Sequence, residues 1–223
     1  MMQRVLIPLY RLDINYIVRH GFGYSVFEYL EEEIYTELLV FTDIEKDVKY
    51  SVFKVQNRSS GKRKISITGY VEWVLGELIP KSVMHIITEN NSSADPVFAR
   101  NEYNSTFADK VVSFDADGFM KTMSGDRSEF VGRNGTLKNP AALSREKLSG
   151  TTGAALDPCA AIQVTVELYE GEEKEIVFRL GMGDNDVAAK ELAKAVKGSD
   201  TAHDALKEVK DYWNKTLSAV QVE

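Results

Sequence analysis

The chain has 223 residues, of which 43% are hydrophobic and 27% are charged, an ordinary composition for a soluble globular protein able to bury a sizeable core. Its formal net charge of -7 argues against a nucleic-acid-binding surface, which needs clustered lysine and arginine side chains. The single cysteine excludes an internal disulfide, and no apolar run approaches the ~20 residues that span a membrane.

The first part of the chain is predicted to form β-strands separated by turns. Residues 4–10 are apolar, and Pro8 favours an edge position because proline lacks the N–H that a central strand donates. Residues 16–20 and 24–30 flank a short glycine-containing segment, which predicts a tight turn. Residues 34–41 are apolar at both alternating positions, as expected of an inner strand covered from both sides.

Further strands are predicted in the middle of the chain. Residues 48–55 and 64–75 are separated by a Ser-Ser-Gly turn, so we expect a long antiparallel hairpin. Gly69 lies within the second strand, where it indicates a bulge or a close approach of another element to the backbone. Residues 83–88 and 110–115 are predicted to be additional strands.

The clearest alternation of apolar and polar residues comes late in the chain. Residues 162–168 and 176–180 place apolar side chains at every second position, and the polar turn 170–173 separates the two runs. We therefore predict an antiparallel hairpin with one buried face. About ten predicted strands with regular turn signals and no helices between them indicate a mainly β fold, a large antiparallel two-sheet sandwich.

Helical periodicity is confined to the C-terminal part of the chain. Residues 184–186 supply N-cap side chains for one helix, Gly198 ends it, and a second helix is predicted to begin near residues 199–201. We therefore divide the chain into a β-sandwich domain, residues 1–183, and a C-terminal helical linker segment, residues 184–223. The second helix carries an apolar stripe that needs cover from the sandwich or from another domain: Ala202, Leu206, Val209, Trp213 and Leu217.

Most signatures of catalytic or metal-binding chemistry are missing from the sequence. His20, His85 and His203 have no second ligand at a metal-binding spacing, so we predict no metal site. Cys159 follows a proline and precedes a strand, which favours a small buried core thiol over a nucleophile. Residues 181–183 lack the third glycine of a dinucleotide-binding loop, and no cofactor is predicted.

One polar segment, residues 124–135, is a candidate carbohydrate-binding site. It combines two arginines, two carboxylates, an asparagine and three glycines, and such a turn-rich segment suits recognition of sugar hydroxyls. The alternative is a salt-bridged loop that holds the two sheets together, with Asp126 and Arg127 as a structural ion pair. The predicted carbohydrate-binding residues are Asp126, Arg127, Glu129, Arg133 and Asn134.

Three aromatic residues, Tyr24, Tyr103 and Trp73, are candidate platforms on which a sugar ring can stack. Trp73 shares its predicted strand face with Ile65 and Ile67, which favours packing in the core instead. Tyr24 and Tyr103 therefore stay open as platforms.

Long motifs distributed along the chain resemble one family. They resemble the β-sandwich domain that precedes the helical barrel of inverting disaccharide phosphorylases, the cellobiose-phosphorylase family (glycoside hydrolase family 94 type), which includes the cyclic β-1,2-glucan synthases. The resemblance extends from about Leu6 to about Trp213. The motifs are HGFGYSVFEY from His20, VEWVLGE from Val71, FARNEYNSTFADKVVSF from Phe98, GDRSEFVGRNG from Gly125 and LSGTTGAALDPCAAIQVTVEL from Leu148.

The resemblance implies a supersandwich of the galactose-mutarotase-like type, followed by linker helices and an (α/α)6 barrel that holds the catalytic acid. No residue of this chain then inherits a catalytic role, and we expect a non-catalytic module of a glycosyltransferase or glycoside phosphorylase. Its implied partners are the catalytic barrel, β-1,2-glucan or a related oligosaccharide, and a second copy in a homodimer. In the family, loops of the sandwich reach towards the mouth of the active site, and residues 126–135 and 149–157 are placed to do so.

Two alternative functions stay open. A stand-alone mutarotase-like enzyme acting on a sugar would need a histidine and a carboxylate converging on a sheet. His20 and His85 with Glu37 or Glu72 are the candidates, and their spacing gives no support. A purely structural dimerisation module would need no site at all. The absence of a signal peptide predicts a cytoplasmic or cytoplasm-facing location, and the resemblance implies part of a larger bacterial enzyme that can be membrane-anchored. We expect no direct membrane insertion by the chain itself.

Overall fold

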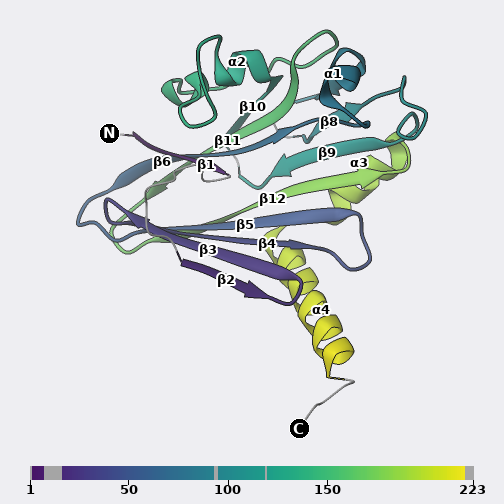
Figure 1. Ribbon diagram of the computed structural model, residues 1–223. Coiled ribbons are helices and arrows are strands. Elements are labelled where there is room, and N and C mark those ends of the chain that lie inside the picture. The colour runs from purple at the N-terminus through teal and green to yellow at the C-terminus, as the bar shows by residue number, and fades with distance from the viewer. Residues whose placement is uncertain (1, 8–16, 93–94, 119, 219–223) are drawn as a thin grey trace.

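The computed structural model describes residues 2–7, 17–92, 95–118 and 120–218. Two β-sheets pack face to face, and helices follow at the C-terminus (Figure 1), so the predicted mainly β, two-sheet fold is confirmed. The small sheet has the strand order β1 (Met2–Ile7), β6 (Arg63–Glu72), β11 (Pro158–Leu168) and β10 (Lys121–Asp126). The large sheet has the order β2 (Ile17–Gly21), β3 (Tyr24–Glu31), β4 (Ile34–Thr42), β5 (Val48–Asn57), β12 (Glu173–Gly183), β9 (Val111–Ala116), β8 (Val97–Arg100) and β7 (Ile87–Glu89).

Several predicted elements are confirmed. β1 lies at an edge of the small sheet, although Pro8 falls outside the described residues. β2 and β3 form a hairpin in which Gly21 pairs with Tyr24 across a two-residue turn. β4 is an inner strand, and β9 occupies the predicted position.

The predicted hairpin between β11 and β12 is wrong. β11 pairs with β6 and β10 in the small sheet, whereas β12 pairs with β5 and β9 in the large one. The chain therefore crosses from one sheet to the other at residues 169–172, forming an arch. Alternation correctly predicted the face that lies between the sheets, because Ile162, Val164 and Phe178 all belong to that core. The prediction of a single buried face is wrong, since Gln163, Val177 and Arg179 on the opposite faces are only 2%, 0% and 2% exposed. Alternation does not reveal which strand is the hydrogen-bonded neighbour of β11 or of β12.

A second arch replaces the hairpin predicted for residues 48–55 and 64–75. β5 belongs to the large sheet and β6 to the small sheet. The two arches lie side by side, because the Asn57 N–H donates to the Glu172 carbonyl at 3.0 Å and the Gly171 N–H donates to the Asn57 carbonyl at 2.8 Å. These paired crossings join the sheets at one end of the sandwich.

Other departures from the prediction are local. β1 runs parallel to β6, so the small sheet is not purely antiparallel. Short helical turns also interrupt the strands, contrary to the prediction that no helices lie between them. Pro80 lies in the first turn of one of them, and of residues 83–88 only the last two belong to a strand. The turns are α1 (Ile79–Ser82), η1 (Val83–His85), α2 (Arg127–Val131) and η2 (Ala141–Ser144).

Gly69 permits a close approach of the facing sheet. β6 pairs with β11 without interruption at this position, so there is no bulge. A Cβ atom at Gly69 would lie 2.5 Å from Cδ1 of Phe178, which is 2% exposed. Of the two explanations predicted for Gly69, a close approach of another element is correct and a bulge is wrong.

We expect Gly69→Ala to lower the free energy of unfolding by about 1–3 kcal/mol, because the added methyl group overpacks the core. Urea denaturation measures the change. Gly61→Ala is the control, since nothing lies within 4 Å of its Cβ position. Equal stability of the two variants would show that the Phe178 ring moves aside without cost.

Two helices, α3 (Asp186–Ala195) and α4 (Ser199–Leu217), cover part of the outer face of the large sheet (Figure 1). Asn185 caps α3 as predicted, its side chain accepting from the Ala188 N–H at 2.9 Å. Ala202, Leu206 and Val209 of the α4 stripe are buried in a cluster with Phe41, Tyr50, Val52 and Val177, and Trp213 is partly buried against it. Leu217 is 42% exposed, so the sandwich covers the stripe only up to Trp213. In the described part of the chain, no helix has the length and apolar character needed to cross a membrane.

Candidate functional site

The segment between β10 and β11 folds over the outer face of the small sheet. α2 and η2 bury an apolar layer there, in which the rings of Phe130 and Tyr70 stack at 4.8 Å. Cys159 belongs to this layer and is fully buried, and burial raises the pKa of its thiol far above the ordinary value. The prediction of a core thiol is therefore confirmed, since a thiol held protonated is a poor nucleophile.

Asp126 and Arg127 begin α2, and both are engaged by the protein. The Asp126 carboxylate accepts from the Ser128 N–H at 2.9 Å as an N-cap. Arg127 donates from Nε to Glu72 at 2.9 Å and from Nη1 to Asp157 at 3.1 Å. The hydrogen bond to Glu72, and after it the one to Asp157, raises the pKa of Arg127 above its ordinary value. The predicted ion pair between Asp126 and Arg127 is therefore wrong: Arg127 pairs with Glu72 and Asp157, and Asp126 is an N-cap.

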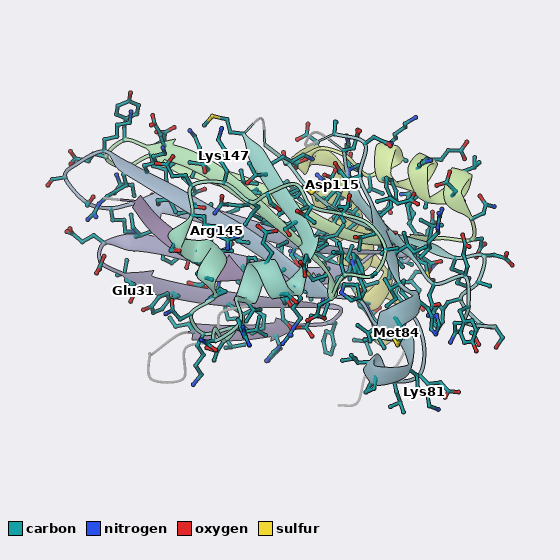
Figure 2. The ribbon with its side chains drawn as sticks, turned by 90° about the horizontal axis from the view of Figure 1, so that it is seen from above. Glu31, Lys81, Met84, Asp115, Arg145 and Lys147 are labelled. Atoms are coloured by element: carbon teal, nitrogen blue, oxygen red, sulfur yellow. The ribbon has the colours of Figure 1, made fainter. Side chains whose placement is uncertain are left out.

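Glu129 of α2 binds the loop 149–157 that precedes β11. Its carboxylate accepts from Ser149 Oγ at 2.6 Å and from Arg145 Nη1 at 2.8 Å, and it also bonds to Ser124. Arg145, labelled in Figure 2, reaches Glu129 from the segment after η2. With a side chain only 16% exposed and several donors already bound, Glu129 holds the loops together.

The loop 149–157 connects the two sheets. The Gly125 N–H donates to the Thr151 carbonyl at 2.7 Å beside β10, in the small sheet. Thr88 of β7, in the large sheet, donates its N–H to the Gly153 carbonyl at 3.1 Å and accepts from the Gly153 N–H at 3.1 Å. The loop 149–157 therefore bridges the two sheets, through hydrogen bonds of Thr151 and Gly153. The sequence alone suggests this bridging role for residues 124–135 instead.

Arg133 and Asn134 differ from the other three predicted residues. They lie in a tight turn closed by the Gly135 N–H, which donates to the Gly132 carbonyl at 3.1 Å, and both side chains are exposed. No hydrogen bond or ion pair joins either side chain to another described residue. An exposed arginine and an exposed asparagine therefore follow each other in one turn, with their donors available to a ligand.

The structure brings one histidine and one carboxylate together that the sequence did not connect. His203 of α4 lies 2.9 Å from Glu175 of β12, with the imidazole 46% exposed. They are 28 positions apart on different elements, so no sequence spacing signals the pair. Among the described residues, no group of three or more His, Cys, Asp or Glu side chains is arranged to hold a metal ion.

The aromatic candidates fall in three different environments. Trp73 is 6% exposed within the core between the sheets, as predicted. Tyr24 packs against the cluster beneath α4, where Lys210 Nζ lies 4.9 Å from its ring centroid. Tyr103 is 78% exposed, and its ring stacks on that of His85 at 4.0 Å.

A family model agrees with this architecture over most of the chain. The model described as "Glycosyl hydrolase 94, supersandwich domain" matches residues 6–199. The chain belongs to this family. The family resemblance seen in the sequence is thereby confirmed, as is the supersandwich fold.

The relatives of this chain are much longer proteins. The chain is 31% identical over 206 residues to the cyclic beta-(1,2)-glucan synthase NdvB of Rhizobium meliloti, covering 92% of this chain and 7% of that protein. It is 24% identical over 222 residues to the N,N'-diacetylchitobiose phosphorylase of Vibrio furnissii, covering 94% of this chain and 26% of that protein. A solved structure described as "Putative kojibiose phosphorylase from human microbiome" aligns with a TM-score of 0.47 and 11% identity, over 86% of this chain and 23% of that one. This chain therefore spans only a small fraction of the length of each relative.

Proposed function

We propose that the chain is a non-catalytic β-sandwich module of a glucan-processing enzyme of the cyclic β-1,2-glucan synthase or disaccharide phosphorylase type. In this proposal it holds an (α/α)6 catalytic barrel and contacts β-1,2-glucan or a related oligosaccharide through the turn after α2. Residues 1–183 form the sandwich and residues 184–223 a helical linker segment. In this proposal the parent enzyme is bacterial and can be membrane-anchored, and the module is cytoplasmic or faces the cytoplasm.

The observation that carries the proposal is the combination of family and coverage. The matched family is a supersandwich domain, and the chain spans 7% and 26% of two relatives whose names state a synthase and a phosphorylase. Within residues 124–135, both carboxylates that could act as acid or base are already bound: Glu129 by Arg145 and Ser149, and Asp126 by the Ser128 N–H. Arg133 and Asn134 are left as donors for sugar hydroxyls, which favours binding over catalysis.

Calorimetric titration with linear β-1,2-glucooligosaccharides tests the contact. We expect the double variant Arg133→Ala/Asn134→Ala to lower affinity about ten-fold, since ~1.4 kcal/mol corresponds to loss of one or two hydrogen bonds to the ligand. Its free energy of unfolding should change by less than ~0.5 kcal/mol, because both side chains are exposed.

Arg127→Ala is the matched comparison within the same segment. Its two part-exposed ion pairs predict a loss of about 1 kcal/mol of stability. Arg58→Ala, an exposed arginine at the β5–β6 arch, controls for charge. If the double variant binds as well as wild type, the turn does not contact glucan. If wild type itself does not bind, the module is a scaffold only, or a dimerisation module if sedimentation shows a dimer.

One observation favours the alternative of a mutarotase-like enzyme: the contact between His203 and Glu175. Against it, His203 lies on the exposed side of a helix that crosses the sheet, not on the sheet itself. A progress curve for sugar anomerisation separates the two functions. A rate above the uncatalysed one that is lost in His203→Ala would establish the enzyme and overturn the non-catalytic role.

A further inference from the structure

The side chain of Tyr103 is unusually open for a large aromatic residue. It is 78% exposed, yet its ring is held parallel to that of His85, with 4.0 Å between centroids and 16° between planes. His85 belongs to η1, and Tyr103 to the turns between β8 and β9. One face of the tyrosine ring is thus supported by the protein, and the opposite face is open to a ligand.

The backbone that carries the ring is fixed by a buried asparagine. Asn101 is 1% exposed, and its side chain accepts from the Tyr103 N–H at 3.2 Å. The same side chain donates to the Leu75 carbonyl at 2.9 Å, which ties this turn to the segment leading into α1. The next turn is closed by Asn104, which accepts from the Phe107 N–H at 3.1 Å. Binding on the open face would therefore order few additional groups.

Charged and apolar residues neighbour Tyr103 and His85 in the chain. Arg100 is part-exposed and bonded to Glu89 at 2.7 Å and to Glu102 at 3.1 Å, which orients charged donors and acceptors close to Tyr103 in the chain. Met84, which precedes His85 in the chain and is labelled in Figure 2, is 80% exposed. An exposed flat aromatic surface, with charged residues nearby in the chain, suits a polar ligand that has one apolar face.

We propose that Tyr103, supported by His85, is a carbohydrate-binding platform separate from the turn after α2. The ligand is a pyranose ring of a β-linked gluco-oligosaccharide: its C–H face lies on the negative face of the tyrosine ring, and its hydroxyls bond to groups at the rim. This proposal rests on the proposed function, which places glucan at the surface of the module. The exposed Leu78 and Ile79 of the same region also suit a protein partner, and the test separates the two.

The test is an amide NMR titration of the full chain with linear β-1,2-glucooligosaccharides, combined with affinities of four variants. We expect saturable shifts at residues 84–86 and 101–107. Tyr103→Ala should lower the affinity of this site at least ten-fold, and His85→Ala should lower it several-fold. Tyr103→Phe keeps the ring and should stay within two-fold of wild type. Tyr169→Ala is the matched control, because this tyrosine is 64% exposed but lies between β11 and β12.

Shifts confined to residues 132–135 would overturn the platform and leave the proposed function standing. Loss of shifts there, with those at Tyr103 retained, would leave the platform standing and remove the α2 contact. Wild-type glucan affinity in Tyr103→Ala would also overturn the platform. If that variant in addition abolished a self-association detected by sedimentation, the region would be a protein-docking surface instead.

Discussion

Lys121→Met should lower the free energy of unfolding by about 3–5 kcal/mol, because it leaves a buried carboxylate without its cation. Lys121 begins β10 of the small sheet, and its ammonium lies 2.6 Å from the carboxylate of Asp115 in β9 of the large sheet. The two side chains are only 7% and 5% exposed. Figure 2 labels Asp115 on its strand. Denaturant unfolding of the two proteins measures the difference.

An exposed ion pair with the same nitrogen–oxygen distance provides the control. Lys190 and Asp186 also lie 2.6 Å apart, but their side chains are 45% and 49% exposed. We expect Lys190→Met to cost less than ~0.5 kcal/mol, because water screens both charges whether or not they are paired. Similar losses in the two variants would mean that the Asp115 carboxylate is solvated after all.

A double replacement separates the value of the pair from the cost of breaking it. In Asp115→Leu/Lys121→Met both charges are removed, so neither is left buried alone. Stability should return to within ~1 kcal/mol of wild type or exceed it, since two desolvated ions are exchanged for apolar contact. A double variant as unstable as Lys121→Met would show that the ions hold the two sheets in register, a role that apolar side chains cannot take over.

The sequence predicts which residues are buried in this fold better than it predicts which strands pair. Alternation in β11 and β12 identifies Ile162 and Phe178 as core residues, and both lie between the sheets. The same alternation occurs whether two strands are neighbours in one sheet or face each other across a core. Only the conformation of the connection distinguishes the two, and it depends on hydrogen bonds between segments more than 100 residues apart.

The candidate site shows the same limit for function. Composition placed Arg127 and Arg133 in one polar segment without distinguishing them. In the fold Arg127 is bound by two carboxylates, one from β6 and one from the loop before β11, whereas Arg133 has no such partner among the described residues. The contact between His85 and Tyr103 was equally hidden, because it joins a 3-10 turn to a loop 18 positions later. Residue type predicts capacity for binding, and tertiary partners decide whether that capacity is already used.

Asn57→Ala should lower the free energy of unfolding by about 3 kcal/mol, since it removes the side chain that joins the two arches. Asn57 is fully buried, and its Nδ2 donates to the carbonyls of Gly61 at 2.7 Å and of Leu168 and Tyr169 at 3.2 Å. Its Oδ1 accepts from Ser59 Oγ at 2.7 Å. Truncation removes the Nδ2 donor from the buried bond to Leu168 and from the part-buried bonds to Gly61 and Tyr169, and it leaves Ser59 without its Oδ1 acceptor. Thermal and urea unfolding measure the loss.

Asn57→Asp tests whether donation to both arches is the essential contact. The carboxylate retains the bond from Ser59 but places negative charge against three carbonyl oxygens, so it should be less stable than Asn57→Ala despite its closer shape. Asn90→Ala is the control, because Asn90 donates only within its own loop, to Asp95 and Pro96. An Asn57→Asp protein more stable than Asn57→Ala would mean that the Ser59 bond dominates and that the arches are held by their backbone bonds. The opposite order would show that one buried amide holds both crossings between the sheets.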